Sequence, residues 1–279
     1  MAPDVDRRPT ERATITRVTG NGPARTLAIR SDELIVEEPL SIQLDGTVVA
    51  TTMRTPGHDR ELAVGFCFTE GLLGAAAVLG VRHCSDETTR AEDSNVVTVD
   101  TGAIAPAPTP RLGNVSSSCG WCGSEQLDEL SVRLAPLPST EPIDLDVLGS
   151  IGAAVFDGQG LFATTGSVHA AALFDPSGRV VVTREDVGRH NAVDKVVGAL
   201  ALGEDDLPEL PATGYGLFVS GRASIEMVQK AWAAGCSTLV AVSAPTALAV
   251  DAARRANLVL AGFVRNDGFN LYAPESQHP

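Results

Sequence analysis

The stretch YGLFVSGRASIEMVQKAWAAGCSTLVAVS, residues 215–243, decides the fold class. Two short apolar runs, at 215–221 and 237–243, flank the segment 224–235, whose apolar residues recur every three or four positions. The same alternation continues with a second helical pattern at 245–256 and a third apolar run at 258–264. A strand–helix–strand–helix–strand order predicts an α/β fold with a mostly parallel sheet covered by helices.

The whole chain divides into four parts, the last of which contains this region. Residues 1–12 are polar and proline-containing, which predicts a disordered tail. Residues 13–101 predict an N-terminal α+β portion, with short strands up to residue 52, an LDGT hairpin turn and a helix within 55–73. Residues 102–124 predict a flexible, proline-rich loop. Residues 125–279 predict the α/β core, including helices within 125–138, 139–157 and 190–203 and a hairpin at 172–188.

Composition and charge exclude several classes of partner. Hydrophobic residues make up 44% and charged residues 20% of the 279 positions, which is ordinary for a soluble domain. The net charge of −14 repels nucleic acid and anionic membranes, so a phosphate ligand needs a local basic pocket. The first residues carry no apolar secretion segment, and no apolar run approaches the roughly 18 residues of a membrane span. We therefore expect a cytoplasmic protein without nucleic-acid or membrane partners.

Two of the five cysteines form a C-x-x-C in SSSCGWCG, residues 116–123. Such a pair can hold half a zinc site, act as a redox dithiol or carry sulfur as a persulfide. A zinc site needs two further ligands, but the other cysteines are isolated and the histidines are dispersed, so we expect no structural metal. From spacing alone the dithiol and the sulfur carrier are equally supported, with Cys119 and Cys122 as the reactive pair.

Basic and hydroxyl residues gather where predicted strands end and helices begin. TREDVGRHNAVDKVVG, residues 183–198, combines a glycine turn with cationic side chains at a helix start, and VSGRASIEMV, residues 219–228, follows a strand. Helix N-termini and arginine forks bind anions. Two adjacent strand ends of this kind outline one crevice. The candidate anion-binding residues are Arg184, Arg189, His190, Ser220, Arg222, Ser224 and Arg265.

One motif tests for a zinc deaminase. His169 in TGSVHAAAL stands where such an enzyme has H-x-E, but position 171 is alanine and no P-C-x-x-C follows. Without the glutamate there is no general acid or base, so a deaminase is excluded.

Seven motifs occur in one order and together closely resemble the formate dehydrogenase accessory sulfurtransferase family of FdhD type. They are TPGHDRELAVGFCFTEGLL, SSSCGWCG, TGSVHAAAL, REDVGRHNAVDKVVG, SGRASIEMVQKAWAAG, SAPTALAV and GFVRNDGFNLY, and the resemblance runs from about residue 25 to 273. It implies a cytidine-deaminase-like three-layer core with a mixed, mostly parallel sheet. It also implies a sulfurtransferase that moves persulfide sulfur from a cysteine desulfurase to the molybdenum cofactor needed by formate dehydrogenase.

The resemblance also implies roles for particular residues. Cys119 matches the persulfide carrier and Cys122 its assistant, while Trp121 between them departs from the smaller residue common in relatives. The client, bis-molybdopterin guanine dinucleotide, would contact a nucleotide-binding stretch that matches Phe263, Val264, Arg265, Asn266, Asp267 and Gly268. The arginines at 184, 189, 222 and 265 would then meet its pyrophosphates. Implied partners are the desulfurase, the formate dehydrogenase catalytic subunit and a second copy in a homodimer.

Two rival functions stay open at this point. A non-catalytic chaperone would hold the molybdenum cofactor for insertion without moving sulfur. A dithiol oxidoreductase would need both Cys119 and Cys122, whereas a carrier tolerates loss of the second.

Overall fold

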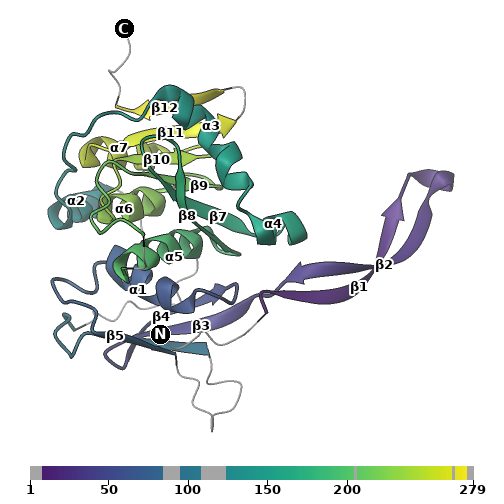
Figure 1. Ribbon diagram of the computed structural model, residues 1–279, viewed down its shortest axis with the longest axis horizontal. Helices are drawn as coiled ribbons and strands as arrows, with labels where there is room; N and C mark the ends of the chain where they lie inside the picture. The colour runs from purple at the N-terminus through teal and green to yellow at the C-terminus, as the bar shows by residue number, and fades with distance from the viewer. Residues whose placement is uncertain (1–7, 84–94, 108–123, 204–205, 266–267, 275–279) are drawn as a thin grey trace.

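Six strands form the larger sheet of the computed structural model, which describes residues 8–83, 95–107, 124–203, 206–265 and 268–274 (Figure 1). Their order is β12-β11-β10-β9-β7-β8. Among these strands only the pairs β9–β10 and β10–β11 are parallel, and the other neighbours are antiparallel. The mixed character is confirmed, but the sheet is not mostly parallel. The strands are β7 (His169–Phe174), β8 (Val180–Asp186), β9 (Gly216–Val219), β10 (Thr238–Ala241), β11 (Val259–Arg265) and β12 (Gly268–Ala273).

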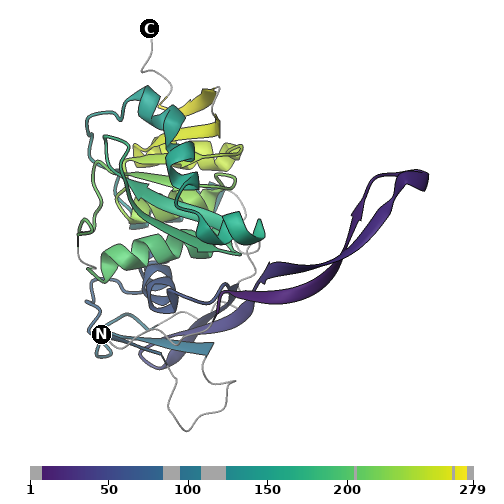
Figure 2. The same ribbon diagram turned by 45° about the vertical axis from the view of Figure 1, so that its right-hand side comes forward.

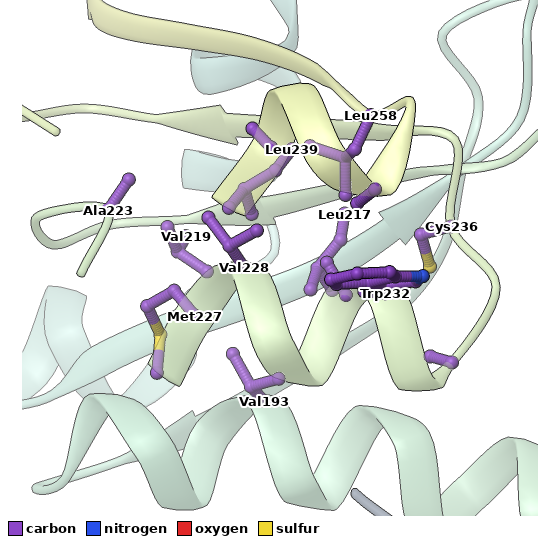
Figure 3. Close-up of a cluster of buried hydrophobic side chains, with 14 of the residues drawn as sticks. Val193, Leu217, Val219, Ala223, Met227, Val228, Trp232, Cys236, Leu239 and Leu258 are labelled. Carbon is purple, nitrogen blue, oxygen red and sulfur yellow. The ribbon is translucent and has the colours of Figure 1, made fainter. Parts of the chain in front are cut away.

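Helices cover both faces of this sheet, because each strand alternates its side chains between two cores. Ala170, Ala172 and Phe174 of β7 pack with α3 (Leu145–Phe156), and Ala171 and Leu173 pack on the other side. The second side is covered by α2 (Ser124–Arg133), α5 (Arg189–Ala201), α6 (Ile225–Ala233) and α7 (Ala247–Ala256). Figure 3 shows part of that second core, where Trp232 and Val228 of α6 point to the strands.

A smaller sheet lies beneath the larger unit and is covered by one helix. Its order is β4-β3-β6-β5, and α1 (Asp59–Thr69) packs between it and α5 (Figure 1). Asp45 and Gly46, with φ of 48° and 83°, form the turn between β3 and β4, so the predicted LDGT hairpin is confirmed. The strands are β3 (Glu38–Leu44), β4 (Thr47–Arg54), β5 (Gly80–His83) and β6 (Val96–Asp100).

Helices α1 and α5 meet backbone to backbone. A Cβ atom built on Gly65 of α1 would overlap the carbonyl group of Asp194, and one on Gly198 of α5 would overlap the carbonyl group of Glu61. Only glycine permits this approach. Next to the crossing, Lys230 of α6 donates hydrogen bonds of 2.9 Å to both carboxylate oxygens of Asp194, which ties α6 to the same junction.

A buried charge pair fixes the start of α1. Arg54, which is 0% exposed, donates bonds of 2.9 and 2.8 Å to the carboxylate of Asp59. Burial by itself raises the pKa of Asp59, but the hydrogen bond from His83 and the Arg54 guanidinium together lower it to about 2. The carboxylate therefore stays charged inside the protein.

This pair predicts an acid-dependent loss of stability. Since the folded pKa of Asp59 lies below its ordinary value of 3.8, its contribution is full above pH 4 and is lost as the pH falls toward 2. Asp59→Asn should cost about 3–5 kcal/mol at pH 7, because buried Arg54 loses the carboxylate that accepts its two shortest hydrogen bonds. That cost should shrink by about 1 kcal/mol at pH 3. Urea unfolding at the two pH values measures the change. Asp157→Asn, at an exposed position, is the control, and an Asp59→Asn cost that is independent of pH would contradict the assignment.

A long two-stranded ribbon projects from the body (Figures 1 and 2). It consists of β1 (Thr10–Thr19) and β2 (Thr26–Ile35), joined through a short turn of 3₁₀ helix, η1 (Gly22–Ala24). The predicted disordered tail therefore ends too late, because residues 10–12 already belong to β1. The boundary was misplaced because the polar sequence TER pairs along the ribbon, with Arg12 donating a 2.8 Å bond to Glu33.

The remaining segments connect these units. The short helix α4 (Gly160–Thr165) follows α3 and was not predicted from the sequence. Of the predicted loop 102–124, residues 108–123 lie outside the described part of the chain, and Ser124 already starts α2. Cys67 and Cys236 are buried, and burial raises the pKa of each thiol to about 12. Within the described ranges, none of the helices has the length and apolar character needed to cross a membrane.

Candidate functional site

Five strand ends meet at one edge of the larger sheet. The parallel strands β9, β10 and β11 finish there, β8 ends there at Asp186, and antiparallel β7 begins there at His169. The N-termini of α5, α6 and α7 start from the same edge. The predicted crevice therefore lies where strand ends and helix starts converge, which is a common ligand-binding position in such sheets.

Two of the three helices at this edge have no N-cap side chain bonded to their first turn. Gly188 precedes α5 and Ser224 precedes α6, and neither side chain caps its helix. By contrast, Thr246 caps α7 by accepting a 3.2 Å bond from the backbone N–H of Ala249. The first N–H groups of α5 thus remain available to an anion, in addition to the positive end of its dipole, whereas at the start of α6 the Glu226 carboxylate accepts a bond from its own backbone N–H.

Polar atoms without partners surround these two helix starts. In the described part of the chain, Arg189 Nε, His190 Nε2 and Ser224 Oγ are buried and have no hydrogen-bond partner. Buried polar groups are nearly always paired, because an unpaired one costs about 1–3 kcal/mol. Glu226 lies near two of them, with Oε2 3.9 Å from His190 Nε2, so Arg189 Nε is the atom that most clearly leaves a hydrogen bond for a ligand to complete. We call Arg189, His190, Arg222 and Ser224 the cationic cluster.

His169 and Ser220 lie next to the cationic cluster and also line a neighbouring cavity. Ser220 Oγ accepts a 2.9 Å bond from the backbone N–H of Ala170 and lies 3.2 Å from His169 Nδ1. A Cβ built on Gly221 would lie 3.3 Å from Arg189 Cδ and 3.6 Å from His169 Cε1. Gly221 therefore leaves room for the Arg189 side chain to lie over the turn that follows β9.

The charges of the cluster favour an anionic ligand. Burial lowers the pKa of Arg189; the Glu226 carboxylate raises it, and nearby Arg222 lowers it again. An anion between the guanidinium groups of Arg189 and Arg222 would offset the cost of burying the Arg189 charge and the repulsion between the two groups. The His190 ring, with Nε2 3.9 Å from Glu226 Oε2, lowers the pKa of Glu226 to about 2, so this carboxylate is charged. Burial lowers the pKa of His169, and the nearby Arg189 and His190 lower it further. The His169 ring is therefore neutral at pH 7.

A cavity of ≈ 460 Å³ adjoins the cluster through His169 and Ser220. Its size lies in the range of about 300–1,000 Å³ that is usual for small-molecule sites. Apolar and aromatic side chains make most of its wall: Phe156, Phe162, Val168, Val187, Phe218 and Val242. A second cavity of ≈ 320 Å³ lies at the opposite edge of the sheet, between Pro138 and Asn257. None of the unpartnered polar atoms found in the described residues belongs to it.

The β11–β12 hairpin extends the site along the edge. Phe263 is 39% exposed and has φ of 55°, in the left-handed region that is costly for a phenylalanine. Arg265 pairs with Gly268 at the hairpin end and is exposed, whereas Val264 is buried in the core under α3. With strands spaced about 4.8 Å apart, β11 lies roughly 10 Å from β9, so an elongated ligand could contact both.

The structure brings together some predicted site residues and separates others. Arg189, His190, Ser220, Arg222 and Ser224 share one place. Arg184 does not join them, because its guanidinium is bound to Glu61 of α1, with Nη2 2.9 Å from Oε1. Cys119, Cys122, Asn266 and Asp267 lie outside the described residues.

Other contributors were not predicted from the sequence. Glu226 lies in the first turn of α6, where an acidic residue is common. Only its distance to His190 shows that it belongs to the candidate site. Phe156 is the last residue of α3 and Phe162 lies within the unpredicted helix α4, and no sequence pattern links them to His169. The glycine after β9 was the one available sequence cue, because glycine at a strand end permits close approach.

Comparison with known proteins supplies the family. The model of the FdhD/NarQ family matches residues 35–278. The chain belongs to the FdhD/NarQ family. A sulfur carrier protein FdhD of Nocardia farcinica is 43% identical over 270 residues, covering 95% of this chain and 94% of that protein. Another, from Anaeromyxobacter dehalogenans, is 45% identical over 251 residues, covering 87% of each chain.

A solved structure supports the fold of this FdhD/NarQ member. The crystal structure of a formate dehydrogenase accessory protein from Desulfotalea psychrophila superposes with a TM-score of 0.71. The superposition covers 95% of this chain and 98% of the Desulfotalea psychrophila chain, at 24% sequence identity. The resemblance seen in the sequence motifs is thus confirmed at the level of family and mixed α/β fold.

Proposed function

We propose that this protein is a sulfur carrier that passes persulfide sulfur from a cysteine desulfurase to the molybdenum cofactor of formate dehydrogenase. The single observation that carries the client-binding half of the proposal is the cationic cluster, with its three buried, unpartnered polar atoms. The names of the relatives support the sulfur-carrying half.

The cluster suits the nucleotide ends of bis-molybdopterin guanine dinucleotide. Each end carries a pyrophosphate, which the open N-terminus of α5 and the forks of Arg189 and Arg222 would bind. The hairpin at Phe263 to Gly268 lies roughly 10 Å further along the edge and would contact a base or ribose. The apolar cavity beside His169 offers a wall for a flat ring system.

The sulfur chemistry is a pair of transfers at Cys119. Its thiolate attacks the terminal sulfur of the persulfide on the desulfurase, so that the S–S bond of the donor breaks and the donor leaves as a thiolate. The terminal sulfur of the new Cys119 persulfide then passes to the metal of the client. Two electrons from the reduced metal convert it to a sulfido ligand, and the Cys119 thiolate is regenerated.

Two buried thiols elsewhere in the chain are unsuited to this role. Cys67 and Cys236 have pKa values raised to about 12, so neither forms the nucleophilic thiolate at neutral pH. Further parts of the proposal are a cytidine-deaminase-like core, which the α3–sheet–α5/α6/α7 layering supports, and action in the reducing cytoplasm.

The test is intact-protein mass spectrometry after incubation with a cysteine desulfurase and cysteine. Wild type should gain one sulfur mass, which a thiol reductant removes, and Cys119→Ala should gain none. Cys236→Ala, which removes a buried thiol, is the matched control and should load normally. A folded wild type that never gains sulfur would refute the carrier function.

The alternative is a cofactor-binding insertion chaperone that moves no sulfur. It shares the anion site with our proposal but predicts that Cys119→Ala still supports formate dehydrogenase activity. Cys122→Ala separates the dithiol oxidoreductase, which loses all activity without its second thiol, from the carrier, which continues to load.

A further inference from the structure

The cavity beside His169 is lined by a buried amide whose side chain has no partner. Gln159 is only 7% exposed and belongs to the wall of this cavity. Within the described ranges its side chain makes no hydrogen bond, although Gln159 is the residue just before α4, where a side chain often caps the helix. Because buried polar groups are nearly always paired, the Gln159 amide is a candidate contact for a ligand in the cavity.

A carboxylate from β8 does the capping that Gln159 does not do. Glu185 accepts bonds of 2.9 and 2.8 Å from the backbone N–H groups of Leu161 and Phe162, at the start of α4. These N–H groups are the donors that the side chain before a helix ordinarily satisfies. Since Glu185 already accepts from them, the Gln159 amide is left to face the cavity.

The walls of the cavity suit a flat and uncharged ring. Phe156 is 56% exposed, and its ring meets that of Phe162 edge to face, with the ring centroids 6.0 Å apart. None of the described residues that line the cavity is an aspartate, glutamate, lysine or arginine, and the His169 ring is neutral at pH 7. Aromatic side chains stack on planar rings. The cavity therefore favours a neutral heterocycle over a phosphate group.

We propose that this cavity holds the pterin ring of the client, with the Gln159 amide bound to the amide edge of that ring. The inference rests on the proposed function and adds a ring-binding residue to it. The pyrimidine part of a pterin carries an N–H group next to a carbonyl group. A glutamine side chain offers one acceptor and one donor to such an edge, so Oε1 accepts from the ring N–H and Nε2 donates to the ring carbonyl.

The place of the cavity assigns it to the pterin, although guanine has the same amide edge. In each half of the client, a pyrophosphate links the pterin to the guanosine. The proposed function places the pyrophosphate at the cationic cluster and the guanosine at the β11–β12 hairpin. The cavity adjoins the cluster directly through His169 and Ser220, and a Cβ on Gly221 would lie 3.3 Å from Arg189 Cδ and 3.6 Å from His169 Cε1. A pterin in the cavity would thus lie next to its own phosphate.

Titration with free hydroxymethylpterin, followed by the fluorescence of the pterin, tests the cavity. Wild type should bind it. Gln159→Met keeps the length of the side chain without the amide and should raise the Kd at least about 10-fold, through the loss of two hydrogen bonds. Gln43→Met, which replaces a half-buried glutamine of the smaller sheet, is the matched control and should bind the pterin as wild type does. Unchanged pterin binding by Gln159→Met would overturn the proposal.

Guanosine diphosphate distinguishes the two ring systems and needs no variant. The Kd of wild type for the pterin should stay the same when guanosine diphosphate is saturating, because the two ligands occupy different places. Displacement of the pterin by guanosine diphosphate would assign the cavity to guanine and overturn the proposal.

Failure of this inference is separable from failure of the proposed function. A wild type that binds guanosine diphosphate and loads sulfur at Cys119, but does not bind the pterin, would overturn the pterin site alone. Failure of the carrier function would instead show in the mass spectrum, as a folded wild type that never gains sulfur whether or not it binds the pterin.

Discussion

Replacing Gly65 or Gly198 with alanine is expected to destabilise the protein by at least about 4 kcal/mol, which places either variant among the most damaging single changes. The added methyl of either alanine would overlap a backbone carbonyl on the facing helix. Side chains can rotate away from such a clash, but a backbone in the middle of a helix cannot. Helices α1 and α5 would have to separate, which would break the contacts between the two units, such as the hydrogen bond from Thr69 to Asp194 and the ion pair of Arg184 with Glu61.

The same substitution elsewhere should have the opposite effect. In α3, a Cβ on Gly149 would lie 3.7 Å from Phe269 and one on Gly152 3.7 Å from Phe218, both ordinary contacts. Alanine in a helix interior is favoured over glycine by about 0.5–1 kcal/mol, so Gly149→Ala and Gly152→Ala should stabilise. Urea unfolding of the four variants gives the comparison. If Gly65→Ala and Gly198→Ala were as stable as wild type, the backbone contact between α1 and α5 would be wrong.

The second large effect concerns the cationic cluster. Arg189→Ala should weaken binding of guanosine diphosphate, the nucleotide end of the proposed client, by about 100-fold. The reason is that Arg189 supplies a half-buried guanidinium whose buried Nε has no hydrogen-bond partner among the described residues and which lies at the open start of α5. Arg189→Lys should recover only part of the affinity, since lysine keeps the charge but not the planar fork. Isothermal titration calorimetry at a fixed salt concentration measures the Kd for guanosine diphosphate of wild type, Arg189→Ala and Arg189→Lys.

Two further variants make this result specific. Gly221→Ala should reduce affinity several-fold, because its Cβ would lie 3.3 Å from Arg189 Cδ and displace the guanidinium. Arg179→Ala removes an exposed arginine that is paired with Asp175 and should leave binding unchanged. Equal losses for Arg179→Ala and Arg189→Ala would mean that only net charge matters. Unchanged binding by Arg189→Ala would remove the cluster from the candidate site.

Much of the site was predictable because it depends on local order. A strand, a glycine and a helix start occur within a few residues at Ser220 to Ser224, and the same holds for Gly188 and Arg189. Such local sequences predict open helix N-termini without knowledge of the fold. Arg184 shows the limit, because it lies in the same motif as Arg189. Its partner Glu61 is 123 residues away, and only the packing of α1 on α5 brings the two together.

The sequence by itself determined the helices other than α4, most strands, the β3–β4 hairpin turn and, through the ordered motifs, the family. Each of these depends on hydrophobic periodicity, turn residues or motif spacing within a short segment. Only the tertiary structure decided the mixed strand order, the glycine crossing at Gly65 and Gly198, the cavity beside His169 and the projecting ribbon. These features depend on which distant segments meet, and periodicity within a segment says which face is buried but not what covers it.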